Sequence, residues 1–150
     1  MAQLIDVALT HEIATITLDS PANRNALSQQ LLAELLAALD AVEAAHARVI
    51  ILTHTPPVFC SGADLKERAT GRVDSTSFVA AIERLGTTSA PVIAAVDGPV
   101  RAGGVGLMAA CDLIVVNSSV TFAVNEVRIG VAPSIVTGPI LQRCSWSKLA

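Results

Sequence analysis

Segments with strand patterns and segments with helix patterns alternate along the sequence, and this order constrains the fold more than any other feature. Residues 4–9 and 13–18 alternate apolar and polar side chains around His11 and Glu12, which predicts a β-hairpin. Further strands are expected at residues 49–53, 92–96 and 113–116, and further helices at residues 78–85, 107–111 and 134–143. We therefore expect an α/β domain whose sheet is mixed, because the opening hairpin is antiparallel.

The best-defined element is a helix that follows a polar turn at residues 19–25. Ser28 is a suitable N-cap, since its side-chain oxygen can accept a hydrogen bond from a free N–H of the first turn. The apolar residues that follow recur every three or four positions, at Leu31, Leu32, Leu35, Leu39 and Val42. Such a stripe predicts one buried helix face.

The composition is more apolar than that of an ordinary domain. Hydrophobic residues make up 52% of the 150 residues and charged residues only 15%, which predicts surfaces covered by another subunit or segment. A chain of this length is expected to form a single domain, residues 1–150, around one core. The sequence stops soon after the expected helix at residues 134–143, so we expect this domain to be incomplete at its C-terminus.

Several classes of partner and location are disfavoured by the same composition. No apolar run approaches the roughly 18 residues of a membrane span, and residues 1–6 lack a signal-peptide pattern, which predicts a cytoplasmic protein without a membrane partner. The net charge of −3 and the few aromatic residues do not suit a nucleic-acid partner. The three cysteines and three histidines lack metal-ligand spacing, so no metal is expected.

A local basic cluster consists of Lys66, Arg68 and Arg72, with Arg24 apart from it. Such a cluster can meet a phosphorylated small ligand, because lysine and arginine side chains bind phosphate. It can equally be solvated surface charge, and the sequence leaves both interpretations open.

Two loops, at residues 59–65 and 100–106, each follow an expected strand and place small residues at the start of a short helix. A helix start presents free N–H donors, and glycine or alanine lets a ligand atom approach the backbone. Either loop alone could be an ordinary strand-to-helix turn. Two such starts that face one point would form an oxyanion hole.

Four motifs carry a family resemblance, in one order along nearly the whole chain. They are Asn25-Ala26-Leu27-Ser28, Phe59-Cys60-Ser61-Gly62-Ala63-Asp64-Leu65-Lys66-Glu67, Ala102-Gly103-Gly104 leading to Ala110-Cys111-Asp112, and residues 122–130. On these motifs the sequence resembles the enoyl-CoA hydratase/isomerase (crotonase) superfamily. The resemblance implies a crotonase-like spiral of β-β-α units, a homotrimer or hexamer, and a C-terminal helical region that is absent from these 150 residues.

The resemblance also implies a substrate and the residues that bind it. The substrate is an acyl-CoA thioester, and because coenzyme A is part of that substrate, no separate cofactor is implied. The backbone N–H groups of Ala63 and Gly103 would hold the thioester oxygen, which suits an enolate intermediate. The other residues at family positions for substrate or coenzyme A contact are Arg24, Ala26, Ser61, Asp64, Leu65 and Gly104.

Glu126 occupies the family position of a glutamate that moves a proton at the substrate carbons, so the resemblance implies that it is the general acid and base. Residue chemistry alone also allows a solvent-facing glutamate paired with Arg128. Many hydratases of the family have a second glutamate three residues beyond the oxyanion glycine, where this sequence has Gly106. Glycine can neither orient nor deprotonate a water molecule.

The reaction predicted from these residues is hydration of a 2-enoyl-CoA to a 3-hydroxyacyl-CoA, with Glu126 as acid and base. In its favour, residues 101–107 and 126–133 are similar to branched-chain enoyl-CoA hydratases such as methylglutaconyl-CoA hydratases. Isomerisation between 3-enoyl-CoA and 2-enoyl-CoA is the alternative, because it needs a single carboxylate. A non-catalytic acyl-CoA-binding protein is the alternative from another class. The acyl chain and the pathway are not predicted.

Two other enzyme classes fit parts of the sequence. The spacing Gly104-x-Gly106-x-x-Ala109 matches a dinucleotide-binding fingerprint, but residues 97–103 separate it from the preceding strand. A hydrolase would use Cys60 or Ser61 as nucleophile and His54 as base, but the G-x-S-x-G elbow is missing. Both are weaker interpretations than the acyl-CoA enzyme.

Overall fold

The expected strands form one mixed sheet. The computed structural model describes residues 2–69, 75–126, 130 and 132–149. Its main sheet contains β1 (Ile5–Thr10), β2 (Ile13–Leu18), β3 (Val49–His54), β4 (Val92–Val96) and β6 (Leu113–Val116), in the order β1-β2-β3-β4-β6. Strands β1 and β2 are antiparallel, and the other neighbours are parallel. The predicted mixed sheet is confirmed.

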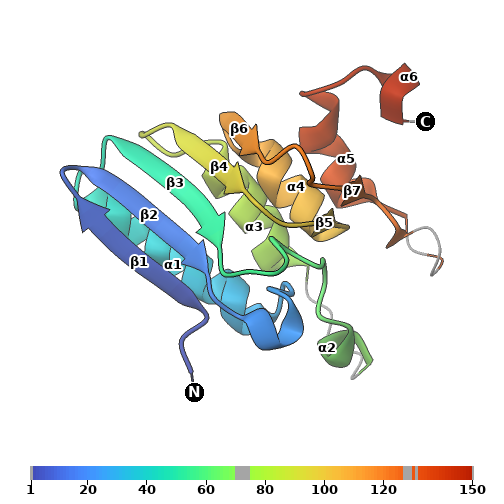
Figure 1. Ribbon diagram of the computed structural model, residues 1–150, viewed down its shortest axis with the longest axis horizontal. Helices are drawn as coiled ribbons and strands as arrows, with labels where there is room; N and C mark the ends of the chain where they lie inside the picture. The colour runs from blue at the N-terminus through green and yellow to red at the C-terminus, as the bar shows by residue number, and fades with distance from the viewer. Residues whose placement is uncertain (1, 70–74, 127–129, 131, 150) are drawn as a thin grey trace.

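Three helices cover one face of this sheet: α1 (Gln29–Ala44), α3 (Thr76–Leu85) and α4 (Gly103–Ala110), as Figure 1 shows. The Ser28 hydroxyl oxygen accepts a hydrogen bond from the Leu31 N–H at 3.1 Å, so the predicted cap is present. All five apolar residues of the predicted stripe in α1 are buried. They share one core with the inward-facing residues of β2, β3 and β4.

The glycine-rich segment differs from its prediction. A loop was expected at residues 100–106, followed by a helix at residues 107–111, but α4 already begins at Gly103. Glycine has low helix propensity, which is why the pattern predicted a loop. Here the missing side chains allow α4 to pack closely, since a Cβ on Gly104 would lie 2.6 Å from the Cβ of Cys60. Tertiary packing therefore overrides local propensity.

Several short elements were not predicted. They are the 3-10 helix η1 (Pro21–Asn23), the strands β5 (Val100–Arg101) and β7 (Phe122–Ala123), and the helix α6 (Trp146–Leu149). Strands β5 and β7 pair in parallel as a second, two-stranded sheet. The Arg101 guanidinium donates to the carbonyl oxygen of Thr121 at 2.6 Å and to its hydroxyl at 2.8 Å, which fixes this pairing. The short helix expected after residues 59–65 is α2 (Leu65–Ala69), and the last long helix is α5 (Ser134–Leu141).

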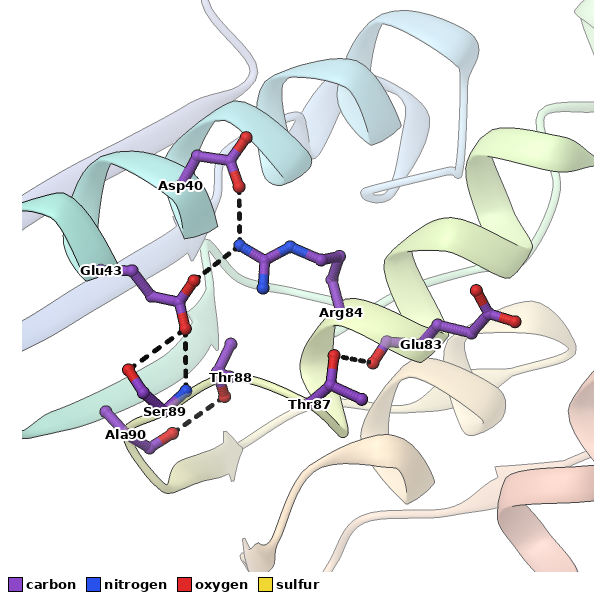
Figure 2. A network of polar contacts seen from close by, with 8 residues as sticks. All are labelled: Asp40, Glu43, Glu83, Arg84, Thr87, Thr88, Ser89 and Ala90. Atoms are coloured by element: carbon purple, nitrogen blue, oxygen red, sulfur yellow. Dashed lines mark hydrogen bonds and ion pairs between the residues drawn. The ribbon is translucent and has the colours of Figure 1, made fainter.

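An ionic network joins α1, α3 and the segment that leads into β4 (Figure 2). The Arg84 guanidinium on α3 contacts Asp40 at 2.6 Å and Glu43 at 2.8 Å, both on α1. The Glu43 carboxylate also accepts a hydrogen bond from the Ser89 N–H at 2.8 Å. The network therefore fixes the relative position of the two helices at the end remote from the glycine loops.

Large apolar side chains are exposed on the edge strand β6, where Leu113, Val115 and Val116 are 41–62% exposed. This agrees with the apolar excess of the composition. Among the residues described, no helix is both long enough and apolar enough to cross a membrane.

Candidate active site

The two glycine-containing loops lie side by side. The Leu27 N–H donates to the Gly62 carbonyl oxygen at 2.8 Å, and the Arg101 N–H donates to the Cys60 carbonyl oxygen at 2.9 Å. Bridges pair Leu27 with Ala63 and Cys60 with Val100. Residues 60–63 are therefore held between the segment before α1 and the segment before α4.

Close packing between the loops depends on Gly62. Its φ of +93° is rarely adopted by residues with a side chain, and a Cβ there would lie 2.6 Å from the Cβ of Ala102. The same Cβ would be 3.4 Å from the backbone nitrogen of Gly103. The peptide before Ala63 is thus next to the start of α4.

Ala102 has an unusual backbone conformation at this contact, with φ 50° and ψ −124°. Such a conformation costs of the order of 1–3 kcal/mol for a residue with a side chain and persists only where neighbours impose it. Ala102 is held by two hydrogen bonds: its N–H donates to Ala123 at 2.8 Å, and its carbonyl accepts from Val105 at 2.9 Å. The conformation that these contacts impose on Ala102 sets the direction of the next N–H, that of Gly103, which is the first in α4.

Ala63 and Gly103 both line one cleft. Gly103 is the first residue of α4, so its N–H has no acceptor within the helix. In the described part of the chain, neither N–H is hydrogen-bonded to a backbone or side-chain acceptor. Two residues from different loops, whose N–H groups lack an acceptor among the described residues, therefore line one cleft, and the positive end of the α4 dipole lies at one of them.

The cleft is open to solvent; it spans about 790 Å³ when the space at its mouth is included, and its walls are largely apolar. Its apolar residues are Leu27, Leu32, Phe78, Ala132, Pro133, Ile135 and Val136. Glu126 also lines it, and its Oε2 atom is buried without a hydrogen-bond partner among the described residues. Burying a carboxylate oxygen without a hydrogen-bond partner costs free energy unless a bound ligand or a proton interacts with it. Glu126 is therefore poised to act on whatever occupies the cleft.

Two further carboxylates line the cleft but serve local structure. Asp64 Oδ1 accepts from the Lys66 N–H at 2.9 Å, and Asp64 Oδ2 accepts from the Asn23 amide at 3.3 Å. Glu67 Oε2 accepts from the Gln29 N–H at 2.9 Å, at the start of α1. Both side chains hold the loops together, which distinguishes them from Glu126.

Comparison with known protein families shows to which family this chain belongs. The family model described as enoyl-CoA hydratase/isomerase matches residues 9–149. The chain belongs to the enoyl-CoA hydratase/isomerase family. The predicted resemblance is confirmed.

The relatives within the enoyl-CoA hydratase/isomerase family are named for more than one reaction. The 4-chlorobenzoyl coenzyme A dehalogenase-2 of an Arthrobacter species is 36% identical and covers 85% of this chain and 50% of its own length. The mitochondrial methylglutaconyl-CoA hydratase of Mus musculus is 34% identical and covers 81% of this chain and 41% of its own length. The chain spans about half the length of the curated relatives it matches.

A solved structure confirms the predicted crotonase fold. The crystal structure of an enoyl-CoA hydratase from Mycobacterium avium is 39% identical and superposes with a TM-score of 0.87. That match covers 99% of this chain and 61% of the solved one.

Of the residues that the family resemblance assigns to catalysis or to coenzyme A binding, only some line the cleft. Ala63, Asp64, Gly103 and Glu126 line it. Arg24 and Leu65 have exposed side chains, whereas Ala26 is buried. Ser61 joins the loops through its N–H, which donates to the Arg24 carbonyl at 3.1 Å. Gly104 is buried, and a Cβ there would lie 2.6 Å from the Cβ of Cys60.

The residues of the predicted basic cluster differ in their positions relative to the cleft. The side chain of Lys66 is exposed on α2, and Arg68 lines the cleft. Arg72 lies outside the described residues, as does Arg128, the partner considered for Glu126. The apolar lining from α3 and α5, such as Phe78 and Val136, was not identified from the sequence, because it depends on how those helices pack.

The alternative hydrolase does not fit the structure. Burial raises the pKa of the Cys60 thiol to about 12, which removes the thiolate that a nucleophile requires. His54 Nε2 accepts a hydrogen bond from the Asp97 N–H at 3.1 Å, and its ring packs edge-on against Phe59 at 5.4 Å. His54 is therefore a structural residue.

The dinucleotide-binding alternative depended on the spacing of Gly104 and Gly106. Both glycines are buried in the packing of α4 against its neighbours.

Proposed function

We propose that this chain is an acyl-CoA enzyme that forms an enolate of an enoyl-CoA thioester, with Glu126 as its general acid and base. The observation that carries the proposal is the position of Glu126. One oxygen of its carboxylate is buried without a hydrogen-bond partner among the described residues, and Glu126 lines the same cleft as Ala63 and Gly103. A carboxylate and two oxyanion donors in one apolar cleft are the groups that this chemistry needs.

In the proposed mechanism the thioester oxygen accepts hydrogen bonds from the two N–H groups. As the Glu126 carboxylate removes a proton, negative charge moves from carbon to that oxygen. The fixed donors stabilise it there, and each such donor typically lowers the barrier by roughly 3 kcal/mol. The apolar walls exclude water and strengthen these interactions.

Two net reactions share this intermediate. Hydration of a 2-enoyl-CoA adds hydroxide at the β-carbon and a proton at the α-carbon, and it is supported by the names of the relatives. Isomerisation moves one proton between the α- and γ-carbons, and it is supported by Gly106, where a second carboxylate would be required for hydration in its usual form. Binding without turnover is the outcome expected of a non-catalytic relative.

Contacts with coenzyme A are part of the proposal. The exposed side chains of Arg24 and Lys66 flank the Ala63 loop and suit the phosphates of that group. The homotrimer or hexamer and the cytoplasmic location predicted from the sequence remain predictions.

The test is exchange of the α-proton of a saturated acyl-CoA with deuterium from D₂O, followed by mass spectrometry. Glu126→Gln should slow exchange at least about 100-fold, because general base catalysis typically contributes that much. Affinity for the acyl-CoA, measured by calorimetry, should stay within about twofold. Glu83→Gln, on the exposed side of α3, is the matched control and should exchange at the wild-type rate. Exchange that is unchanged in Glu126→Gln would reject the assignment.

A further inference from the structure

Arg101 lies where three segments of the chain meet. Its backbone N–H donates to the Cys60 carbonyl oxygen at 2.9 Å, on the loop that carries Ala63. Its guanidinium donates to the carbonyl oxygen and the hydroxyl of Thr121, at the start of the segment that leads through β7 to Glu126. Arg101 is also the last residue of β5, two positions before α4 begins (Figure 1). One residue therefore contacts the first loop, the entry to α4 and the segment that carries the carboxylate.

The strand pairing that holds β7 is short. It includes hydrogen bonds from the Val100 N–H to the Thr121 carbonyl oxygen at 3.0 Å and from the Ala102 N–H to the Ala123 carbonyl oxygen at 2.8 Å. Parallel pairing is slightly less stable per residue than antiparallel pairing. Burial of one strand face normally fixes the register, but Phe122 in β7 is 47% exposed. The backbone ladder alone thus specifies the register of β7 only weakly.

The guanidinium of Arg101 adds a clamp across both strands. Its Nη1 donates to the carbonyl oxygens of Val100 at 3.0 Å and Thr121 at 2.6 Å, one from each strand. Its Nη2 donates to the Thr121 hydroxyl at 2.8 Å. Because the planar guanidinium presents its donors in fixed directions, these three acceptors are satisfied together in one register of β5 and β7. A lysine would supply a point charge without this fork.

The register of β7 determines where Glu126 lies. Glu126 follows Ala123 by three residues, and Gly103 directly follows Ala102, so the bond from Ala102 to Ala123 links the two groups of the candidate site. A slip of one residue would move β7 by about 3.3 Å along β5. A misplacement of about 1 Å can already slow a reaction about 100-fold.

We propose that Arg101 is a positioning residue, which sets the place of the Glu126 carboxylate relative to the Gly103 N–H by clamping Thr121. This inference rests on the proposed function and deepens it. Arg101 acts through the backbone of β7 rather than on the substrate. The role is the same for hydration and for isomerisation, because both reactions use this carboxylate and this N–H.

The clamp itself is tested without a substrate, by amide hydrogen exchange followed by NMR. In Arg101→Gln, the Val100 and Ala102 amides should exchange at least about tenfold faster than in the wild type, because their bonds to β7 open locally. The Ile50 amide, which donates to the Pro91 carbonyl oxygen at 3.0 Å, reports unfolding of the main sheet and should change less. Equal changes at the three amides, or no change at any of them, would overturn the clamp.

The effect on the reaction is tested by deuterium exchange at the α-carbon of a saturated acyl-CoA. Arg101 is half-buried and Thr121 is exposed, so Arg101→Gln leaves no buried cavity and should fold. Its kcat for exchange should fall at least about tenfold, with KM within about twofold, because the carboxylate is displaced while the substrate contacts remain. Arg101→Lys should give a kcat between those of Arg101→Gln and the wild type. A wild-type kcat in folded Arg101→Gln would overturn the proposal.

Arg84→Gln is the matched control for a loss of stability alone. It also removes an arginine that makes charged contacts at 2.6 and 2.8 Å, but at the end of α3 remote from the glycine loops. Arg84→Gln should lower Tm and keep the wild-type kcat for exchange. If Arg84→Gln and Arg101→Gln slow exchange equally, the effect of Arg101 is on stability and the positioning role is wrong.

Thr121→Val removes the hydroxyl acceptor of the clamp and keeps the branched shape of the side chain. It should slow exchange about threefold, because one hydrogen bond of the clamp is lost. In the double variant with Arg101→Gln it should cause no further slowing, since both substitutions remove the same contact. Effects that multiply in the double variant would show that Arg101 does not act through Thr121.

The two assays separate this inference from the proposed function. Exchange that depends on Glu126 but not on Arg101 would retain the proposed function and overturn the positioning role. Exchange that persists unchanged in Glu126→Gln would overturn the proposed function and the positioning role with it, whereas the amide measurement would still decide whether Arg101 clamps β7.

Discussion

Gly62 and Ala102 meet so closely that a Cβ on Gly62 would lie 2.6 Å from the Cβ of Ala102. This contact sets the distance between the loop that carries Ala63 and the start of α4. Gly62→Ala should therefore lower the free energy of unfolding by about 2 kcal/mol, from the positive φ and the clash together. It should also slow deuterium exchange at the acyl-CoA α-carbon, because the two N–H donors would separate. Urea unfolding and the exchange assay measure the two effects.

Gly86→Ala is the control for this substitution. Gly86 ends α3 at a negative φ of −85°, and a Cβ there meets atoms only at 3.8 Å. Its stability and exchange rate should equal those of the wild type within about 0.5 kcal/mol. If Gly62→Ala behaves like Gly86→Ala, the contact with Ala102 does not position the donors.

Much of the fold could be predicted because hydrophobic periodicity reports burial directly. Strand β4 was predicted at its observed bounds, and the buried stripe of α1 was predicted residue by residue. The start of α4 and the pairing of β5 with β7 could not be predicted in this way. Both depend on contacts between distant segments, such as Gly104 with Cys60, which leave no local periodicity.

The candidate site was predictable only in part, for a related reason. The two loops and Glu126 were found from motifs, and the structure places Ala63, Gly103 and Glu126 on one cleft. The contact of Val136 with Gly106 was not predicted, because an apolar residue on α5 resembles any other core residue until its neighbours are known.

The buried thiols give a prediction of chemical reactivity. Burial raises the pKa of both Cys60 and Cys111 to about 12, so both thiols stay protonated at pH 8 and lack the thiolate that reacts. Cys144 is only partly buried. Iodoacetamide at pH 8 should therefore alkylate Cys144 in the native protein and all three thiols in urea, as peptide mass spectrometry would show. In Cys144→Ser, alkylation of the native protein should be at least about tenfold slower. Rapid alkylation of Cys60 would contradict its burial.

Asn25 should contribute strongly to stability, because its side chain is fully buried and binds three backbone groups. Its Oδ1 accepts from the Ser20 N–H at 2.7 Å, and its Nδ2 donates to the carbonyls of Thr55 at 3.1 Å and Val58 at 2.7 Å. Asn25→Ala should lower the free energy of unfolding by roughly 2–3 kcal/mol, because these groups lose their partners. Asn117→Ala, an exposed asparagine, should change it by less than about 0.5 kcal/mol in the same urea titration. Equal losses in the two variants would contradict this role.

The ionic network of Figure 2 gives a prediction of pH dependence. The hydrogen bond from the Ser89 N–H and then the Arg84 guanidinium hold the pKa of Glu43 below its ordinary value of 4.5. A carboxylate whose pKa is lower in the folded state stabilises the protein above the unfolded pKa, and this contribution is lost as pH falls through the folded pKa. The stability difference between wild type and Glu43→Gln should therefore be constant above about pH 5.5 and shrink below pH 4.5.

Urea titrations at pH 3 to 7 measure this difference, with Glu83→Gln as the control. The Glu83 carboxylate points away from the network in Figure 2, so that variant should follow the wild type at every pH. The Glu43 contribution should also fall as salt is added, because an ion pair that solvent partly reaches is screened. A difference between wild type and Glu43→Gln that stays constant down to pH 3 would show that the charge of Glu43 does not stabilise the fold.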